Sequence, residues 1–376
     1  MVECRTAVTG SYPDCMHLDR AATLLRDSGV DVALVSPGPD LRYLIGYDAV
    51  PLERLTLLVL RAEGDATLVV PALERAEAER TPFALGGGVV ASWGETEDPW
   101  TLVRAAAGSP ARIAVDPHMW ASRLLRAQEV FPQAGIEAPP LVSALRTVKE
   151  AGEVDALREA GEAIDRVHRR IPSLLRPGRT EREVASDIAE AILDEGHVRV
   201  DFVIVASGPN GASPHHSVSD RVIDIGDPVV IDIGGTMPSG YCSDCTRVYV
   251  IGEPPSDYVE HYQALRAAQE EAVTAVRPGV PCSGIDAVAR SALERAGLGD
   301  MFIHRTGHGI GLETHEDPYI VSGNDVPLVP GMAFSVEPGF YIPGAFGARI
   351  EDIVVCGEAG PIRLNNVDRA LCIVSP

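Results

Sequence analysis

Residues 228–250 read PVVIDIGGTMPSGYCSDCTRVYV. Two apolar runs rich in β-branched residues flank a glycine-containing turn, which is the pattern of a β-hairpin with buried strands. Asp232 interrupts the first run and Asp244 the second. The hairpin would bring both carboxylates side by side in apolar surroundings. An ionised group needs a cation there, because burying it alone is strongly unfavourable.

The C-terminal region repeats this feature. Glu337 follows the apolar run 333–336, and Glu351 lies within the strand-like run 348–355. His308 joins them from a glycine-rich segment. Four carboxylates and one imidazole are too many for a structural zinc site. They suit two divalent cations that share bridging carboxylates and activate a water.

A buried carboxylate can instead be neutralised by an arginine. Arg247, Arg305 and Arg349 are the candidates close to these ligand-type residues in the sequence. For any single carboxylate this alternative stays open. For the whole set it is disfavoured, because the nearby cations are too few.

An internal repeat is visible in the same region. The triplet Arg-Pro-Gly occurs at 176–178 and again 101 residues later at 277–279, each time after an amphipathic helical stretch. A second helix follows each triplet, predicted for 180–196 with a capping box that begins at Thr180, and for 283–297. Each helix pair is then followed by a strand, a histidine-bearing loop and two strands with carboxylates. The matching sets are His215, Asp232 and Asp244 in the first half and His315, Glu337 and Glu351 in the second. The sequence therefore predicts two related halves that face one site.

Five short strings resemble the pita-bread metallopeptidases, and within them the Xaa-Pro peptidases, prolidase and aminopeptidase P. They are VIDIGG (230–235), SDCTR (243–247), GHGIGLETHE (307–316), EPG (337–339) and RIED (349–352). The resemblance begins at about residue 150 and includes all five ligand positions. Creatinase shares this fold without the metal ligands, and methionine aminopeptidases usually lack a large N-terminal domain. The resemblance implies an α+β pita-bread catalytic domain with an internal pseudo-twofold repeat.

The resemblance also implies roles for the ligands. Asp232 would chelate one metal ion, Asp244 and Glu351 would bridge both ions, and His308 and Glu337 would complete the second. A hydroxide that bridges the metals would be the nucleophile. Glu337 would take the proton of the attacking water and pass it to the leaving nitrogen.

Further residues match substrate-contacting positions of the family. His215 and His315 are expected to hold the scissile carbonyl and stabilise its oxyanion. Only the Pro-His pattern favours His215 over its neighbour His216. His304 matches a substrate-pocket histidine, and Arg349 matches a residue that orients Glu351 or the substrate. Two aromatic residues, Phe340 and Tyr341, are compatible either with the proline pocket or with the core.

The first 145 residues alternate helix-like and strand-like segments, which predicts an α/β domain with a mixed sheet. The predicted segments are a helix at 18–28, strands at 32–35, 55–60 and 66–70, and a helix at 71–80. The segment 37–47 resembles the entrance loop of a creatinase-like N-terminal domain. We expect this domain to span 1–145 and the catalytic domain to span 146–376, with a long helix over 153–171.

Composition limits the partners. The 376 residues carry a formal net charge of −22, which argues against nucleic acid and anionic membranes. The N-terminus lacks the pattern of a signal peptide, and the seven cysteines do not form a disulfide framework, so we expect a cytoplasmic protein. Cys242 and Cys245 flank Asp244, as space-filling strand residues or as a redox pair.

These observations predict a dinuclear metal-dependent exopeptidase that hydrolyses Xaa-Pro bonds in a proline-containing peptide. Mn²⁺ is the expected ion, with Co²⁺ or Zn²⁺ as alternatives. The resemblance implies a homodimer. One alternative uses the same fold and metals on a small amide or osmolyte, and another is a non-catalytic peptide-binding module. The choice between dipeptidase and aminopeptidase stays open.

Overall fold

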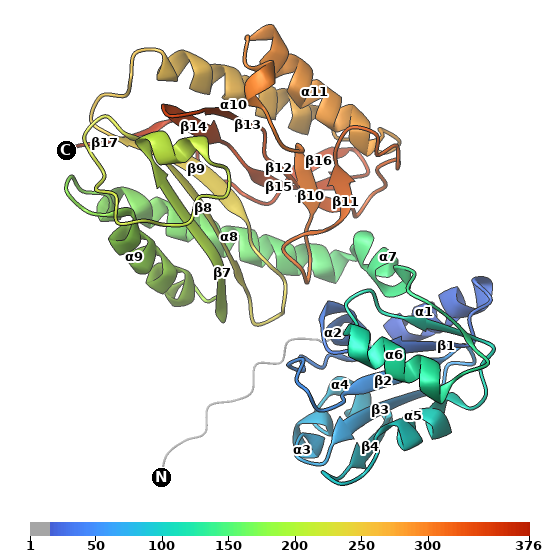
Figure 1. Cartoon of the computed structure of the whole chain (residues 1–376). Helices are drawn as coiled ribbons and strands as arrows, with labels where there is room; N and C mark the ends of the chain where they lie inside the picture. The colour runs from blue at the N-terminus through green and yellow to red at the C-terminus, as the bar shows by residue number, and fades with distance from the viewer. Residues whose placement is uncertain (1–15) are drawn as a thin grey trace, which may run out of the picture. The chain divides into compact units, whose positions relative to one another are not determined.

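The computed structural model describes residues 16–376, and the chain divides into two units between Arg146 and Thr147 (Figure 1). We call them the N-terminal unit and the C-terminal unit. Each contains a hydrophobic core of its own.

A mixed six-stranded sheet forms the centre of the N-terminal unit, in the order β4-β3-β2-β1-β5-β6. The pairs β1–β2 and β2–β3 are antiparallel, whereas β3–β4, β1–β5 and β5–β6 are parallel. This confirms the predicted mixed sheet. The strands are β1 (Val32–Val35), β2 (Leu57–Arg61), β3 (Ala66–Pro71), β4 (Val89–Trp93), β5 (Arg112–Val115) and β6 (Gly135–Glu137).

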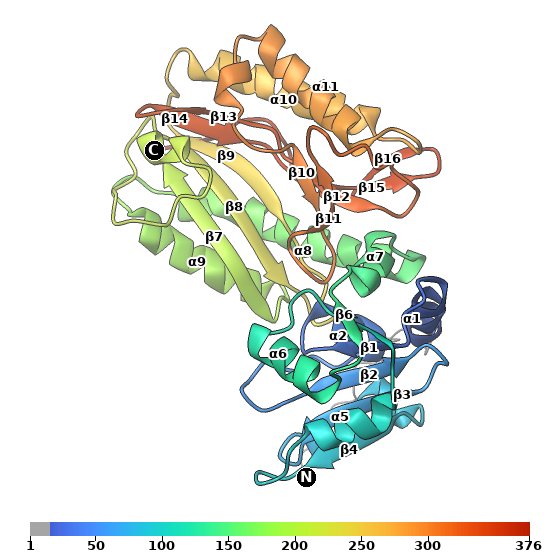
Figure 2. The same ribbon diagram turned by 45° about the vertical axis from the view of Figure 1, so that its right-hand side comes forward.

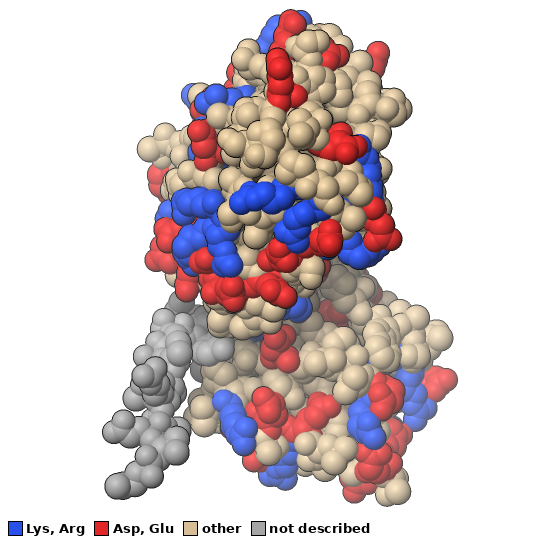
Figure 3. All heavy atoms as spheres, turned by 90° about the vertical axis from the view of Figure 1, so that its left-hand side faces the viewer, with Lys and Arg blue, Asp and Glu red and all other residues tan. Residues whose placement is uncertain are grey.

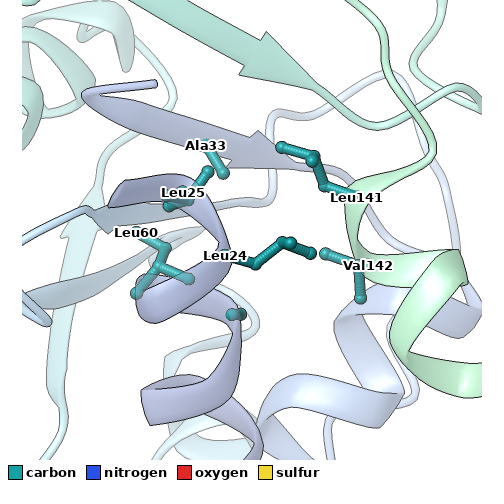
Figure 4. Close-up of a pocket in the computed structure, with 7 residues that line it drawn as sticks. Leu24, Leu25, Ala33, Leu60, Leu141 and Val142 are labelled. Carbon is teal, nitrogen blue, oxygen red and sulfur yellow. The ribbon is translucent and has the colours of Figure 1, made fainter. Parts of the chain in front are cut away.

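Helices cover this sheet because its strand residues are apolar on both faces. Val32 and Leu34 belong to the core that α5 and α6 complete, whereas Ala33 lies on the face towards α1. A cavity of about 10 Å³ remains there, lined by apolar side chains (Figure 4). It is a packing gap, since a water in it would find no polar partner. The helices are α1 (Met16–Asp27), α2 (Pro39–Ile45), α3 (Arg75–Ala78), α4 (Pro82–Leu85), α5 (Trp100–Ala107), α6 (Ala121–Val130) and α7 (Leu141–Thr147).

Two local predictions in this unit are wrong. The predicted helix 71–80 is reduced to one turn, α3, because Pro71 still belongs to β3 and pairs with Trp93. The segment 37–47 is not a loop, since it contains α2, which begins with Pro39 and ends at Gly46 with φ 68°. Proline in the first turn and a left-handed glycine after the last are standard helix boundaries.

The C-terminal unit contains two helix pairs with strands between them (Figures 1 and 2). One sheet has the order β17-β9-β8-β7, the other β11-β10-β12-β15-β16, and β13 pairs with β14. The first half comprises α8 (Ala151–Leu174), α9 (Glu181–Asp194), β7 (Arg199–Ser207), a 3₁₀ turn at Gly208–Ala212, β8 (Pro228–Thr236) and β9 (Cys245–Ile251). The second half comprises α10 (Tyr258–Ala275), α11 (Cys282–Arg295), a 3₁₀ turn at Gly299–Met301, β10 (Gly307–Gly309), β11 (Glu316–Ile320), β12 (Ala333–Val336), β13 (Gly339–Ile342), β14 (Phe346–Arg349), β15 (Asp352–Gly357), β16 (Gly360–Arg363) and β17 (Cys372–Val374).

The predicted internal repeat is present in the backbone. Gly178 and Gly279, which end the two Arg-Pro-Gly triplets, both have φ 85°, a conformation that favours glycine. An isolated β-bridge follows each triplet, Thr180 with Val222 and Pro281 with Pro327. The neighbouring strands β7-β8-β9 correspond to β10-β12-β15. The two halves therefore share one order of helix pair and antiparallel strands.

Helix α9 shows how local sequence fixes this order. Thr180 accepts a hydrogen bond from the backbone N–H of Glu183, whose carboxylate accepts one from the backbone N–H of Thr180, so the predicted capping box is confirmed. The apolar side of α9 then packs with α8 against the sheet.

The distribution of charge on the surface and the apolar character of the helices both bear on the partners of the protein. On the face shown in Figure 3, basic and acidic side chains are interspersed rather than separated. From residue 16 onward, no helix combines the length and the apolar character needed to cross a bilayer.

Candidate metal centre

The hairpin of β8 and β9 places two of the predicted ligands on one face. Asp232 is opposite Thr246 in the ladder, and Asp244 precedes Thr246 by two residues, so both carboxylates lie on the same side of the sheet. The sequence placed Asp244 within a strand, but it comes immediately before β9, one residue outside the observed strand. Both side chains are buried.

The other three ligands come from the second half. His308 is the middle residue of β10, Glu337 directly follows β12, and Glu351 lies between β14 and β15. Thr246 connects the halves, since its hydroxyl donates to Glu351 Oε2 at 2.8 Å and its carbonyl oxygen accepts from the Glu351 N–H at 3.3 Å. The structure thus brings all five sequence-predicted ligands together.

Their ligand atoms form three overlapping groups. Within each group the atoms lie within 4.8 Å of one another. The groups are Asp232, Asp244 and Glu351; His308, Glu337 and Glu351; and Asp244, His308 and His315. Asp244, His308 and Glu351 each belong to two groups, so the three groups form one continuous set of donors. Of these three residues, the two carboxylates have a second oxygen with which to bind a second cation.

The electrostatics of the cluster fit divalent cations. Asp232 Oδ1 is buried and has no hydrogen-bond partner among residues 16–376. Burial and the neighbouring carboxylates raise the pKa values of Asp244 and Glu351 well above their usual range. Divalent cations would offset this repulsion, and oxygen-rich donor sets suit hard or borderline metals.

Arginine pairing explains only part of the cluster. Arg349 is buried, forms an ion pair with Asp232, and has its Nε 3.8 Å from Glu337 Oε2. Arg247 instead pairs with Asp352 at 2.6 Å. Within the described part of the chain, neither Asp244 nor Glu351 has an arginine ion-pair partner. The cluster keeps uncompensated negative charge for a cation.

Glu337 differs from the other carboxylates of the cluster. Burial raises its pKa, but the hydrogen bond and charge of His308 outweigh burial and lower the value. His308 Nε2 lies 3.2 Å from Glu337 Oε1, which also accepts from Ser335 Oγ at 3.0 Å. Glu337 is therefore held in its ionised form.

The adjacent histidines of the 214–216 loop have different surroundings. His216 Nε2 lies 2.8 Å from Glu181 Oε2, whereas His215 is exposed and faces the cavity without a hydrogen bond to any residue from 16 to 376. Across the site, the ring centroid of His315 lies 3.9 Å from that of His308. Partial burial and the charge of His308 lower the pKa of His315 to about 4.

His304 and Arg349 meet through one aromatic residue. His304 Nε2 lies 2.9 Å from the Tyr341 hydroxyl, which accepts a hydrogen bond from Arg349 Nη1 at 2.9 Å. Phe340 is fully buried and packs against other aromatic rings of the core. Of the two aromatic residues with open assignments, Tyr341 thus contacts the site and Phe340 belongs to the core.

A cavity of about 650 Å³ opens onto the five ligands and has a size typical of small-molecule sites. Sequence reasoning missed several residues that line it: Asp201, Phe202, Ile204 and Thr314. Ile204 pairs with Asp232 in the β7–β8 ladder, so the alternation of β7 could have placed it and Phe202 on the site face. Asp201 and Thr314 carry no comparable sequence signal.

The two cysteines beside Asp244 are buried. Burial raises the pKa of Cys242 to about 12 and that of Cys245 well above its usual range. Since thiolates are the reactive form, burial and a raised pKa favour a space-filling role for these side chains over a redox role.

Comparisons with known proteins match both units. The model of "Metallopeptidase family M24" matches residues 155–358, and that of "Creatinase/Prolidase N-terminal domain" matches residues 17–148.

Individual relatives cover nearly the whole chain. The "Probable dipeptidase PepE" of Mycobacterium tuberculosis is 52% identical over 95% of this chain and 96% of its own length. The "Xaa-Pro dipeptidase" of Lactobacillus delbrueckii subsp. lactis is 37% identical over 92% of this chain and 95% of its own. The crystal structure of a prolidase from Thermococcus sibiricus superposes with a TM-score of 0.90 at 38% identity, covering 97% of this chain and 100% of the other.

Proposed function

The chain belongs to metallopeptidase family M24, with a creatinase-type N-terminal domain before a pita-bread catalytic domain, and from this premise we propose that it is an Xaa-Pro dipeptidase that uses two Mn²⁺ ions. It is a metal-dependent exopeptidase for Xaa-Pro bonds. The observation that supports the proposal most is the convergence of four carboxylates and His308 at the cavity. Relatives named dipeptidases support the choice of a dipeptide substrate.

The residues that would hold the ions are Asp232, Asp244, His308, Glu337 and Glu351. When bound, two divalent cations supply Lewis acidity and a nucleophilic water at neutral pH. The oxygen-rich donor set supports Mn²⁺, with Co²⁺ and Zn²⁺ as the competing ions.

Glu337 is the proposed general base and acid. Its carboxylate is anchored by Ser335 Oγ and His308, so one geometry is available for proton transfer. It takes a proton from the attacking water and delivers it to the proline nitrogen, which leaves as an amine and needs that proton.

The proposed substrate contacts lie around this base. His215 and His315 would donate to the scissile carbonyl oxygen as negative charge develops on it. His304 and Arg349 would shape the subsite through Tyr341, which both contact. An Xaa-Pro bond has no N–H and a ring that fixes φ, so side chains must replace the backbone hydrogen bonds that general peptidases use.

We extend the proposal to the setting of the enzyme. We propose a cytoplasmic homodimer with a domain boundary after residue 145. The division of the structure between Arg146 and Thr147 supports this boundary. The interspersed charges of Figure 3 and the net charge of −22 support small peptides, and neither nucleic acid nor membrane, as partners.

The test compares Ala-Pro with Ala-Pro-Ala, using Mn²⁺-loaded protein and a chelated control. Cleavage of the dipeptide alone, lost on chelation, is the expected result. Cleavage of the tripeptide would identify an aminopeptidase. Chelator-sensitive cleavage of neither would favour a small amide or osmolyte substrate. Asp232→Ala and Glu351→Ala should lose both bound metal and activity, and full retention of both would overturn the mechanism.

A further inference from the structure

Two arginines line the cavity, and their surroundings differ. Arg349 is fully engaged, with hydrogen bonds to Asp232, Thr246 Oγ1, the Pro214 carbonyl oxygen and the Tyr341 hydroxyl. The guanidinium of Arg305 makes no hydrogen bond or ion pair with any residue in the described range 16–376. Arg305 is therefore the lining cation whose donors are available to a ligand.

The structure holds Arg305 in place without using its charge. The Arg305 carbonyl oxygen lies 2.7 Å from His304 Nδ1, and the next residue, Thr306, donates its N–H and hydroxyl to Asp286 of α11. The Arg305 guanidinium lies over the Tyr319 ring, 4.3 Å from its centroid. A guanidinium stacked on an aromatic face keeps its in-plane N–H groups free and loses little entropy when it binds.

None of the carboxylates that line the cavity pairs with Arg305 in the described range 16–376. Four of them are the proposed metal ligands. The fifth, Asp201, already accepts hydrogen bonds from Arg199 Nε at 2.6 Å and from Thr236 Oγ1 at 2.7 Å. An unpaired, pre-organised guanidinium that lines the cavity fits an anionic group of the substrate.

We propose that Arg305 binds the C-terminal carboxylate of the Xaa-Pro dipeptide and is a specificity-determining residue. The proposal rests on the proposed function, because a dipeptide presents that carboxylate one residue beyond the scissile bond. Arg305 is bonded in sequence to His304 and lines the same cavity as His304 and His315, two residues that the proposed function places on the substrate.

The consequence is a choice of substrate length. A carboxylate can form two parallel N–H···O bonds with a guanidinium, whereas a longer peptide or an amide presents a neutral carbonyl there. Charged hydrogen bonds of this kind correspond to about a 10- to 100-fold preference. Arg305 would therefore favour Xaa-Pro over both Xaa-Pro-amide and Xaa-Pro-Xaa.

The experiment compares Ala-Pro with its amide, Ala-Pro-NH₂, in Mn²⁺-loaded wild type, Arg305→Met and Arg305→Lys. Arg305→Met should lower kcat/KM for Ala-Pro by about 10- to 100-fold, mainly through KM, and leave the amide rate unchanged. Arg305→Lys should recover part of the loss. Arg295→Met is the matched control, since this exposed arginine pairs with Glu271 on the helices. Equal losses on both substrates, or no loss on either, would overturn the proposal.

A binding measurement separates this proposal from the proposed function. Calorimetry of L-proline and prolinamide with Mn²⁺-loaded protein reports the carboxylate contact without turnover. Weaker binding of proline alone in Arg305→Met supports the contact even if no peptide is cleaved. Equal binding of proline by the variant and wild type would refute the contact even if Ala-Pro is hydrolysed.

Discussion

His216 Nε2 lies 2.8 Å from Oε2 of Glu181, a carboxylate with no exposed surface. The same carboxylate accepts hydrogen bonds from Ser207 and Ser219, at the two ends of the loop that bears His215. On the other side of His215, the Pro214 carbonyl oxygen accepts from Arg349 at 3.4 Å. The loop is thus fixed on either side of the proposed catalytic histidine, while that histidine stays free.

Glu181→Gln should loosen this loop. Burial raises the pKa of Glu181, but the hydrogen bonds from Ser207, Ser219 and Asn210 outweigh burial and lower it to about 2. A glutamine cannot accept all of these donors, so we expect a loss of about 2 kcal/mol in unfolding free energy and about a 10-fold fall in kcat. Urea unfolding and peptide hydrolysis measure both.

The control is Glu190→Gln, an exposed position on the same helix, which should change neither quantity. The lowered pKa adds a pH signature. The stabilisation from Glu181 is complete above pH 4.5 and is lost as pH falls towards 2. A Glu181→Gln variant with wild-type stability at pH 7 would contradict this interpretation.

Asp244→Asn should change stability in opposite directions with and without metal. In chelated protein it removes a buried carboxyl group whose ionised form is disfavoured by burial and by the neighbouring carboxylates, so the unfolding free energy should rise by about 1–2 kcal/mol at pH 7. With Mn²⁺ it removes a ligand, and the gain in Tm on adding metal should shrink. Thermal unfolding with EDTA and with Mn²⁺ measures both.

Asp352→Asn is the matched control. Asp352 is equally buried but is paired with Arg247, Arg363 and Arg369, so its loss should destabilise the protein in both conditions. If Asp244→Asn destabilised the chelated protein as well, the cluster would not be repulsive in the absence of metal.

The sequence predicted those features of the site that leave a local pattern. Asp232 stood out because a carboxylate interrupts a buried strand, and the alternation of the hairpin then placed Asp244 on the same face. The repeat was visible because Gly178 and Gly279 each need a backbone conformation that favours glycine. The helix predicted at 71–80 failed because the residues after Pro71 have helical propensity while Pro71 itself ends a strand.

Long-range partners could not be predicted. His215 and His216 are neighbours in one loop, and what distinguishes them is Glu181, which lies 35 residues earlier. Arg305 and Arg349 were equal candidates to neutralise a ligand, yet Arg349 is buried against Asp232 and Arg305 stacks on Tyr319. These differences depend on tertiary contacts that no spacing in the sequence encodes.

His168→Gln should flatten the pH dependence of stability. Complete burial and the charge of Arg247 lower the pKa of His168 to about 3, so the native side chain stays neutral while the unfolded one titrates near 6.5. Below pH 6.5 the unfolded state therefore binds more protons, and the unfolding free energy falls by about 1.4 kcal/mol per pH unit as pH decreases. Urea unfolding from pH 7.5 to pH 5 should show a shallower slope in the variant. Parallel curves would mean that His168 is charged in the folded protein.

Thr246→Val should weaken metal binding without removing a ligand. The Thr246 hydroxyl donates to Glu351 Oε2 at 2.8 Å and accepts from Arg349 Nε at 3.2 Å, so it orients a proposed bridging ligand. Valine keeps the shape of this buried side chain and removes both hydrogen bonds. Loss of such outer contacts typically reduces metal affinity by about 10- to 100-fold, which competition with a fluorescent chelator would measure.

Thr236→Val is the matched control for this prediction. This substitution also removes two hydrogen bonds, those of Thr236 with Arg199 and Asp201, but Thr236 does not contact a proposed metal ligand. Both variants should be destabilised, and only Thr246→Val should bind Mn²⁺ more weakly. Equal metal affinities in the two variants would show that the threonine contributes to folding and not to ligand geometry.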